Sequence, residues 1–160
     1  MDRRGHLRLF TDIVNSTVRA AELGDEAWTA LLEEHFRILR SLVARYRGDK
    51  TTGDGIVATF DGPGRAVRCA LAAVESVKEI NLEIRAGCRT GEIQMTDADV
   101  AGVAVHAAAR VTDLAGPGEV LTTRTVKELV AGGGLMFDDR GIHGLRGAPG
   151  DWPLFAARSD

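Results

Sequence analysis

Two aspartates in the N-terminal third of the sequence have neighbours that could give them a chemical role. Asp12 is the one carboxylate in the apolar stretch LRLFTDIV, and Asp54 is flanked by glycines in KTTGDG. An unpaired carboxylate among apolar side chains costs on the order of several kcal/mol unless a cation satisfies it. Each aspartate also has a simpler interpretation, since Asp12 could cap the turn at 15–17 and Asp54 could be an ordinary turn residue. Taken one at a time, the two residues leave these alternatives open.

Considered as a pair, the two aspartates point to a metal site. Residues 7–14 are typical of a buried strand, and DKTTGDGIVATF is typical of a hairpin with Asp54 near its tip. If the strand of Asp12 lies beside that hairpin, the two carboxylates can face each other. Carboxylate oxygens with open positions suit Mg²⁺ or Mn²⁺, which bind carboxylates together with substrate phosphates. The pair therefore predicts a divalent-metal site.

The elements that must position these residues alternate between strands and helices. The apolar spacing predicts a helix over 16–47, broken at Gly24, and a second helix that opens with the proline of PGRAVRCALAAVESVKEI. The stretch NLEIRAGCRTGEIQM is typical of a strand pair or one long bent strand. This order predicts a ferredoxin-like β-α-β-β-α-β sandwich of the α+β class, with helices on one face of an antiparallel sheet. Further elements follow: a helix at 103–115, a strand at EVLTT, a helix at 123–131, and a closing strand pair around 135–140 and 152–157.

Length, charge and cysteine content narrow the class of protein. With 160 residues and 44% hydrophobic composition, residues 1–160 suit a single domain with a core over about 7–157. The net charge of −3 argues against a nucleic-acid partner, and no apolar run approaches the roughly 20 residues that cross a bilayer. Cys69 and Cys88 lack the spacing of a zinc site or a redox pair. We therefore expect a cytoplasmic protein in which no membrane contact is evident.

Three motifs in order resemble the catalytic domain of class III nucleotidyl (adenylyl and guanylyl) cyclases, of the bacterial adenylyl cyclase type. They are LFTDIVNST, KTTGDG, and DVAGVAVHAAAR followed by GPGEVL, within a resemblance that runs from about Leu7 to Phe155. The resemblance implies the nucleotidyl cyclase fold, in which additional C-terminal helices and strands follow the ferredoxin-like core. It also implies a lyase activity that converts ATP to 3′,5′-cyclic AMP and pyrophosphate.

The resemblance assigns metal and phosphate roles to the first two motifs. Two Mg²⁺ or Mn²⁺ ions per active site would be held by Asp12 and Asp54, with the backbone carbonyl of Ile13 as a further ligand. The triphosphate would lie at a helix start, a position favoured by free N–H groups and the helix dipole. The backbone amides that would bind it are those of Asn15, Ser16 and Thr17.

In the family, a lysine and an aspartate recognise the purine, and the matching residues here are Lys50 and Asp99. A lysine ammonium can donate to adenine N1, and a carboxylate can accept from the exocyclic amine. Guanine reverses this donor and acceptor pattern, so it would leave buried groups unpaired. Ala101 falls where many members of the family have a larger residue, which would widen the pocket without deciding its polarity. Without the resemblance, Lys50 could equally be a solvated strand residue, and Asp99 could cap the following helix.

Charge on the phosphates during the reaction would be stabilised by Arg110, His106 and Arg146. His106 and Arg110 are four residues apart on the expected helix and project from one face, a spacing that usually marks a solvated helix surface. His106 stands where the family generally has asparagine, and its imidazole can still donate one hydrogen bond. Arg146 occupies the position of a phosphate-binding lysine and keeps its charge.

The family builds each active site across a head-to-tail dimer, so we expect a homodimer with two equivalent sites. Lys50 and Asp54 are separated by about 13 Å if the chain is extended, which makes it awkward for one nucleotide to reach both in one chain. Two other hypotheses remain. One is a non-catalytic, cyclase-like module that binds nucleotide and dimerises. The other is a palm-type enzyme such as a diguanylate cyclase or polymerase, against which stands the absence of a GG[DE]EF-like loop.

Overall fold

The structure is a computed structural model that describes residues 6–50, 56–91, 110–130, 132–145 and 148–159. Its elements follow in the order β1 (His6–Ile13), α1 (Ser16–Leu23), α2 (Asp25–Arg45), β2 (Asp49–Lys50), β3 (Ile56–Phe60), α3 (Pro63–Lys78), β4 (Ile84–Gly91), β5 (Val120–Thr123), α5 (Arg124–Val130), β6 (Leu135–Leu145) and β7 (Ala148–Ser159).

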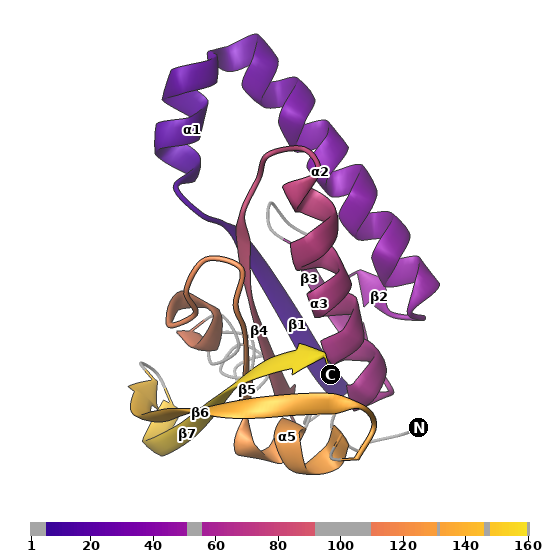
Figure 1. Ribbon diagram of the computed structural model, residues 1–160, viewed down its shortest axis with the longest axis vertical. Helices are drawn as coiled ribbons and strands as arrows, with labels where there is room; N and C mark the ends of the chain where they lie inside the picture. Colours follow the sequence, from indigo (N-terminus) through magenta and orange to yellow (C-terminus); the bar gives the residue numbers. More distant parts are fainter. Residues whose placement is uncertain (1–5, 51–55, 92–109, 131, 146–147, 160) are drawn as a thin grey trace, which may run out of the picture.

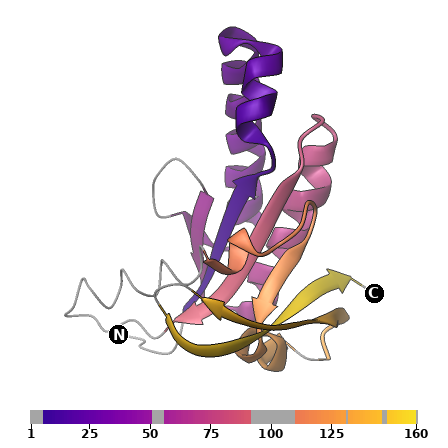
Figure 2. The same ribbon diagram turned by 90° about the vertical axis from the view of Figure 1, so that its left-hand side faces the viewer.

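One sheet of seven strands, in the order β2-β3-β1-β4-β5-β7-β6, holds the described residues together. β1 is central and runs antiparallel to both β3 and β4, whereas β4 and β5 are parallel. The first four strands with α2 and α3 form the expected β-α-β-β-α-β arrangement, which confirms the predicted fold class. β1, β4 and β5 run side by side in Figure 2.

The helices begin and end where the local sequence predicts. Gly24 separates α1 from α2 with a φ of +85°, a left-handed value that glycine adopts without a Cβ clash. α3 begins with Pro63, which has no N–H to leave unpaired in the first turn, and Lys78 in the last turn suits the negative end of the helix dipole. Of the helix expected at 103–115, residues 110–113 are helical and 103–109 lie outside the described part. No described helix is both long and apolar enough to cross a membrane.

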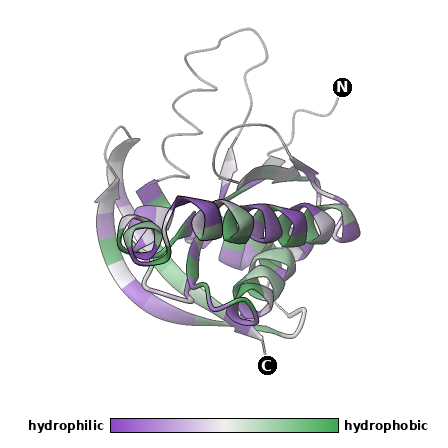
Figure 3. Ribbon diagram, turned by 90° about the horizontal axis from the view of Figure 1, so that it is seen from above, coloured by the Kyte–Doolittle hydropathy of each residue, from purple (hydrophilic) through white to green (hydrophobic). Residues whose placement is uncertain are grey.

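α2 and α3 cover one face of the sheet, which we call the helical face. They lie side by side in front of the strands in Figure 1. Hydrophobic and hydrophilic residues alternate along both helices in Figure 3, as expected for helices with one side on a core. From the strands, Leu7 and Leu9 of β1 and Ile84 of β4 enter this core, and each is at most 1% exposed. Both cysteines are free and buried there.

The opposite side, which we call the charged face, carries the alternate residues of the same strands. Arg8 and Asp12 of β1 pair in register with Arg89 and Arg85 of β4. A smaller apolar cluster also lies on this side, formed by Val111, Ala115, Leu121 and Leu154. The helical residues 110–113 pack closely on Gly87, where an added Cβ would lie 2.4 Å from Thr112 Oγ1.

Candidate active site

Asp12 lies near the C-terminal end of β1, and its carboxylate is paired with Arg85 of β4. Arg85 Nη2 donates to Asp12 Oδ2 at 3.0 Å, and Arg85 Nε donates to the same oxygen at 3.4 Å. The side chain of Asp12 is 50% exposed and that of Arg85 is 31% exposed, so solvent reaches the pair. A carboxylate among apolar side chains was expected to need a cation, and in this structure the cation beside Asp12 is Arg85. Among the described residues, no hydrogen bond joins the Asp12 carboxylate to the turn at 15–17.

A second ion pair continues from Arg85 toward Arg110. Arg85 Nη1 donates to the backbone carbonyl of Asp113 at 3.3 Å, and Arg110 Nη1 donates to Asp113 Oδ2 at 3.2 Å. Asp12, Arg85, Asp113 and Arg110 thus form a continuous chain of contacts on the charged face, in which Asp113 takes part with both its backbone carbonyl and its carboxylate. Because these pairs are partly exposed, they contribute little to stability and can exchange partners when a ligand arrives.

Directly after β1, the chain turns into the N-terminus of α1. Asn15 adopts a left-handed conformation with φ 55° and makes no side-chain cap. The first backbone hydrogen bond of the helix runs from Arg19 N to Asn15 O, so the earlier amides of Ser16 and Thr17 have no partner within the helix. Free amides and the positive end of the helix dipole favour an anion at this position. The predicted triphosphate-binding segment therefore lies beside the Asp12 end of the sheet.

The oxygen donors described here suit a hard divalent cation. Asp12 offers a half-exposed carboxylate, and Ile13 follows it at the end of β1. β1 pairs with β3 up to Thr11 and Ile56, so the strands are neighbours as the metal hypothesis requires. No group of three or more histidine, cysteine, aspartate or glutamate side chains forms a closed cage within the described ranges. An open oxygen site that is completed by substrate phosphates fits Mg²⁺ or Mn²⁺.

Lys50 lies apart from Asp12. Its backbone in β2 is opposite Ala58, which in turn is opposite Leu9 of β1. Two strand spacings and three residue rises place the backbones of Lys50 and Asp12 about 14 Å apart. The other residues predicted for the site, namely Asp54, Asp99, Ala101, His106 and Arg146, lie outside the described residues.

Arg85 and Asp113 are the two site residues that the sequence interpretation missed. Arg85 is the first charged residue of the apolar strand IRAGC, a signal of the same kind as Asp12 in its own strand. The pairing itself could not be read from the sequence, because 73 residues separate Arg85 from Asp12 and only the sheet register brings them together.

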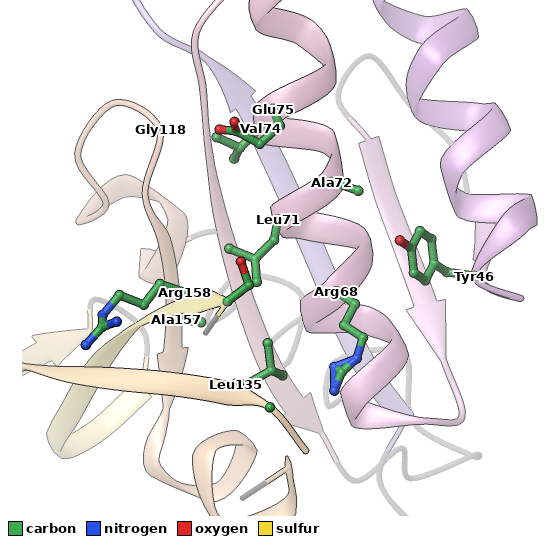
Figure 4. Close-up of a pocket in the computed structure, with 12 residues that line it drawn as sticks. Tyr46, Arg68, Leu71, Ala72, Val74, Glu75, Gly118, Leu135, Ala157 and Arg158 are labelled. Atoms are coloured by element: carbon green, nitrogen blue, oxygen red, sulfur yellow. The ribbon is translucent and has the colours of Figure 1, made fainter. Parts of the chain in front are cut away.

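A groove of about 620 Å³ lies on the other side of the molecule, away from these residues. Arg68 and Leu71 of α3 border it on one side and Leu135 of β6 on the other, as Figure 4 shows. None of the residues predicted from the sequence lines it. The volume of this groove is therefore no reason to place the active site there.

Comparison with known proteins identifies the family to which the chain belongs. Residues 8–156 match the sequence model described as the adenylate and guanylate cyclase catalytic domain. The chain is a member of this family. The cyclase domain is also 32% identical over 138 residues to an adenylate cyclase of Streptomyces griseus, a match that covers 83% of this chain and 34% of the relative.

Solved structures share the fold of this cyclase domain. The adenylyl cyclase CyaB from P. aeruginosa superposes with a TM-score of 0.82 at 21% identity, over 99% of this chain and 96% of that one. The guanylate cyclase domain of RhGC from Catenaria anguillulae, solved with GTP, gives 0.78 at 16% identity, over 98% and 97%. The fold thus occurs both in a protein named an adenylyl cyclase and in one named a guanylate cyclase. The chain spans 22 to 35% of the length of the curated relatives it matches.

Proposed function

We propose that this cyclase domain converts ATP to 3′,5′-cyclic AMP and pyrophosphate at two metal-dependent sites shared across a homodimer. The observation that carries the proposal is the Asp12 end of the charged face. There a half-exposed carboxylate, the Arg85 guanidinium and the amides that open α1 lie next to one another. Together they offer an oxygen ligand for a cation and positively charged groups for a triphosphate.

In the proposed reaction the ribose 3′-oxygen attacks the α-phosphorus in line. A bond forms between these atoms, the bond from the α-phosphorus to the bridging oxygen breaks, and pyrophosphate leaves with that electron pair, while the proton of the 3′-hydroxyl passes to water or to a phosphate oxygen of the substrate. Bound Mg²⁺ or Mn²⁺ supplies Lewis acidity toward the hydroxyl and the phosphates. Asp12, Ile13 and Asp54 would hold the two ions.

The remaining residues of the site bind and orient the phosphates. The amides of Asn15, Ser16 and Thr17 point positive charge at the triphosphate. Arg85 would move from the Asp12 carboxylate to a phosphate oxygen once a cation takes its place. Arg110, His106 and Arg146 would stabilise negative charge as pyrophosphate departs. Arg110 is already held within the described site by Asp113 at 3.2 Å.

Preference for ATP would come from Lys50, Asp99 and the space beside Ala101. The ammonium and the carboxylate match the acceptor at adenine N1 and the donor at its amine, and guanine would leave both unpaired. The separation of about 14 Å between the backbones of Lys50 and Asp12 supports a site shared between chains. One nucleotide would then contact the metal ligands of one chain and the purine-binding residues of its partner.

A turnover assay tests this proposal. Purified protein is incubated with ATP or GTP in the presence of Mg²⁺ or Mn²⁺, and the products are identified by mass. We expect cyclic AMP and pyrophosphate in equal amounts, and a higher kcat/KM for ATP than for GTP. Cyclic GMP as the main product would overturn the purine assignment. Nucleotide binding with no cyclic product in either metal would favour the non-catalytic module instead.

A further inference from the structure

A second group of cations on the charged face has no part in the proposed reaction. Arg8 of β1 and Arg89 of β4 are direct partners in the antiparallel register. Side chains opposed in this way leave the same side of the sheet with Cβ atoms about 4.5–5.5 Å apart. Two like charges at that separation destabilise each other unless an opposite charge lies against them.

Because Arg8 and Arg89 are partly or fully buried, the lack of an opposite charge beside them costs more free energy than it would in water. Arg8 is 8% exposed, and the Nε atoms of Arg8 and Arg89 are buried with no hydrogen-bond partner in the described part of the chain. Desolvation lowers the pKa of both guanidinium groups below the usual arginine value. Within the described ranges, no carboxylate forms an ion pair with either residue. Asp49, the acid in the same cross-sheet row, is two strands away at about 10 Å.

Two side chains beside this arginine pair also have hydrogen-bond donors. The Arg89 guanidinium stacks over the Trp152 ring, with 4.7 Å from Cζ to the ring centroid. Trp152 Nε1 and Thr123 Oγ1 are likewise buried, and neither has a hydrogen-bond partner among the residues that the structure describes. Thr123 is opposite Leu154 in the β5–β7 register, and Trp152 lies two residues before Leu154 on the same side of the sheet. A ligand for these four side chains must therefore be rich in acceptor oxygens.

We propose that Arg8 and Arg89 form a binding site for a phosphate-type oxyanion, bordered by Thr123 and Trp152 and separate from the site at Asp12. Planar guanidinium groups bind phosphate oxygens in pairs, which matches a ligand that only accepts hydrogen bonds. Arg8 and Asp12 are four residues apart along β1, about 13 Å, so one phosphate group cannot contact both. The oxyanion comes either free, as phosphate or pyrophosphate, or as part of a nucleotide. The proposal stands whether or not the domain is an adenylate cyclase.

Thermal unfolding of the whole chain tests the site without any turnover. EDTA removes divalent metal, ionic strength is held constant with sodium chloride, and phosphate, pyrophosphate or ATP is added in separate series. At ten times its Kd, a bound oxyanion should raise Tm by about 3–5 °C. A response to phosphate or pyrophosphate indicates the free anion, and a response to ATP alone indicates the nucleotide. No response in any series overturns the proposal.

Substitutions locate the response on the sheet. Arg8→Gln and Arg89→Gln should each abolish the rise in Tm, and neither should lower the Tm measured without anion, because each removes one of two repelling charges. Arg40→Gln, the same change on the exposed surface of α2, should keep the full response. Arg85→Gln should keep the response to inorganic phosphate too, because in EDTA no cation displaces Arg85 from Asp12. If Arg8→Gln fails to fold, Arg89→Gln tests the same site from the neighbouring strand.

Two results would contradict the assignment. A response that survives both Arg8→Gln and Arg89→Gln, or that disappears in Arg85→Gln, places the anion elsewhere. A lower anion-free Tm in both variants, together with dissociation of a dimer on gel filtration, would mean that a carboxylate of a second copy satisfies the two arginines. Because none of these readouts is catalytic, an inactive enzyme and an absent anion site remain distinguishable.

Discussion

The two faces of the sheet use alternate residues of the same strands for opposite purposes. On the helical face, Leu7 and Leu9 of β1 are each 1% exposed and pack under α2 and α3. On the charged face, Arg8 and Asp12 of the same strand meet only arginines of β4 in register. Because side chains alternate along a strand, a shift of one residue would exchange the two sets. One register therefore fixes both the core and the candidate site.

This difference predicts how substitutions on the two faces will behave. Changes on the helical face should alter the free energy of unfolding, because they open cavities in a close-packed core. Changes on the charged face should alter binding and turnover, because its ion pairs are partly exposed and contribute little to stability.

The largest expected effect is the loss of activity in Asp12→Ala. Removing a ligand of a catalytic cation should lower turnover at least about 10³-fold, whereas the free energy of unfolding should change by less than about 1 kcal/mol. Cyclic nucleotide formation and urea unfolding measure the two effects. Glu33→Ala, the same loss of charge on the exposed surface of α2, should match the wild type. Substantial turnover in Asp12→Ala would remove this residue from the metal site.

Leu9→Ala should show the reverse behaviour. Leu9 is 1% exposed, so its truncation should cost about 2–5 kcal/mol in the free energy of unfolding. Activity per folded molecule should stay near the wild-type value, because the catalytic groups leave the other side of β1. Val18→Ala is the control, since Val18 is 55% exposed and should lose less than about 0.5 kcal/mol. A loss below about 1 kcal/mol for Leu9→Ala would contradict the assigned core.

His35, which is buried on the helical face, should make the free energy of unfolding decrease in acid. Burial lowers its pKa from 6.5 to about 4, and within the described ranges neither ring nitrogen has a hydrogen-bond partner. The unfolded chain therefore binds a proton at a higher pH than the folded one, so the stabilisation is complete above about pH 6.5 and is lost as the pH falls toward 4. The loss should be about 3 kcal/mol. His35→Leu should lack this component, and parallel pH profiles for the two proteins would exclude it.

Gly87→Ala should give a smaller effect on both properties. Its Cβ would lie 2.4 Å from Thr112 Oγ1 and 2.6 Å from Thr112 N, so residues 110–113 would have to move away from β4. We expect a loss of about 1–3 kcal/mol and reduced turnover, because Arg110 lies in the displaced segment. At Gly64 an added Cβ meets nothing within 4 Å, so Gly64→Ala is the matched control. Wild-type values of stability and turnover for Gly87→Ala would contradict the close packing.

Much of the fold could be predicted because the pattern of β1, α2 and α3 is local. The break at Gly24 and the start of α3 at Pro63 follow from single residues with strong backbone preferences. β6 and β7 were predicted too short. They run over Leu135–Leu145 and Ala148–Ser159 through glycines with positive φ, such as Gly141 and Gly150, which in sequence resemble turn signals. Cross-strand pairing holds the strands together despite those residues, with register shifts at two points.

The candidate site could be predicted in its motifs and not in its contacts. Asp12 could be recognised because it is a lone carboxylate in an apolar strand. Arg85 is, in the same way, a charged residue in the apolar start of β4. Nothing local indicates that these two side chains meet, since Arg85 lies 73 positions after Asp12 in the sequence and three helices intervene. The same holds for Arg8 and Arg89, whose opposition depends entirely on the β1–β4 register.

The proposed sharing of each active site between two chains has a direct test in mixed dimers. Asp12→Ala and Arg110→Ala should each be inactive alone. In a mixed dimer one site collects both defects, and the other takes its aspartates from the Arg110 variant and its arginine from the Asp12 variant.

The measurement is cyclic AMP formation after equal amounts of Asp12→Ala and Arg110→Ala have exchanged subunits. With free exchange half the dimers are mixed and half their sites are intact, so activity should recover to about a quarter of wild type. Mixing Asp12→Ala with Asp54→Ala is the control and should stay inactive, because both defects lie on the same side of every site. No recovery in the first pair despite demonstrated exchange would mean that each site is built within one chain. Recovery in the control would mean that the two aspartates of a site come from different chains, which also contradicts the proposed arrangement.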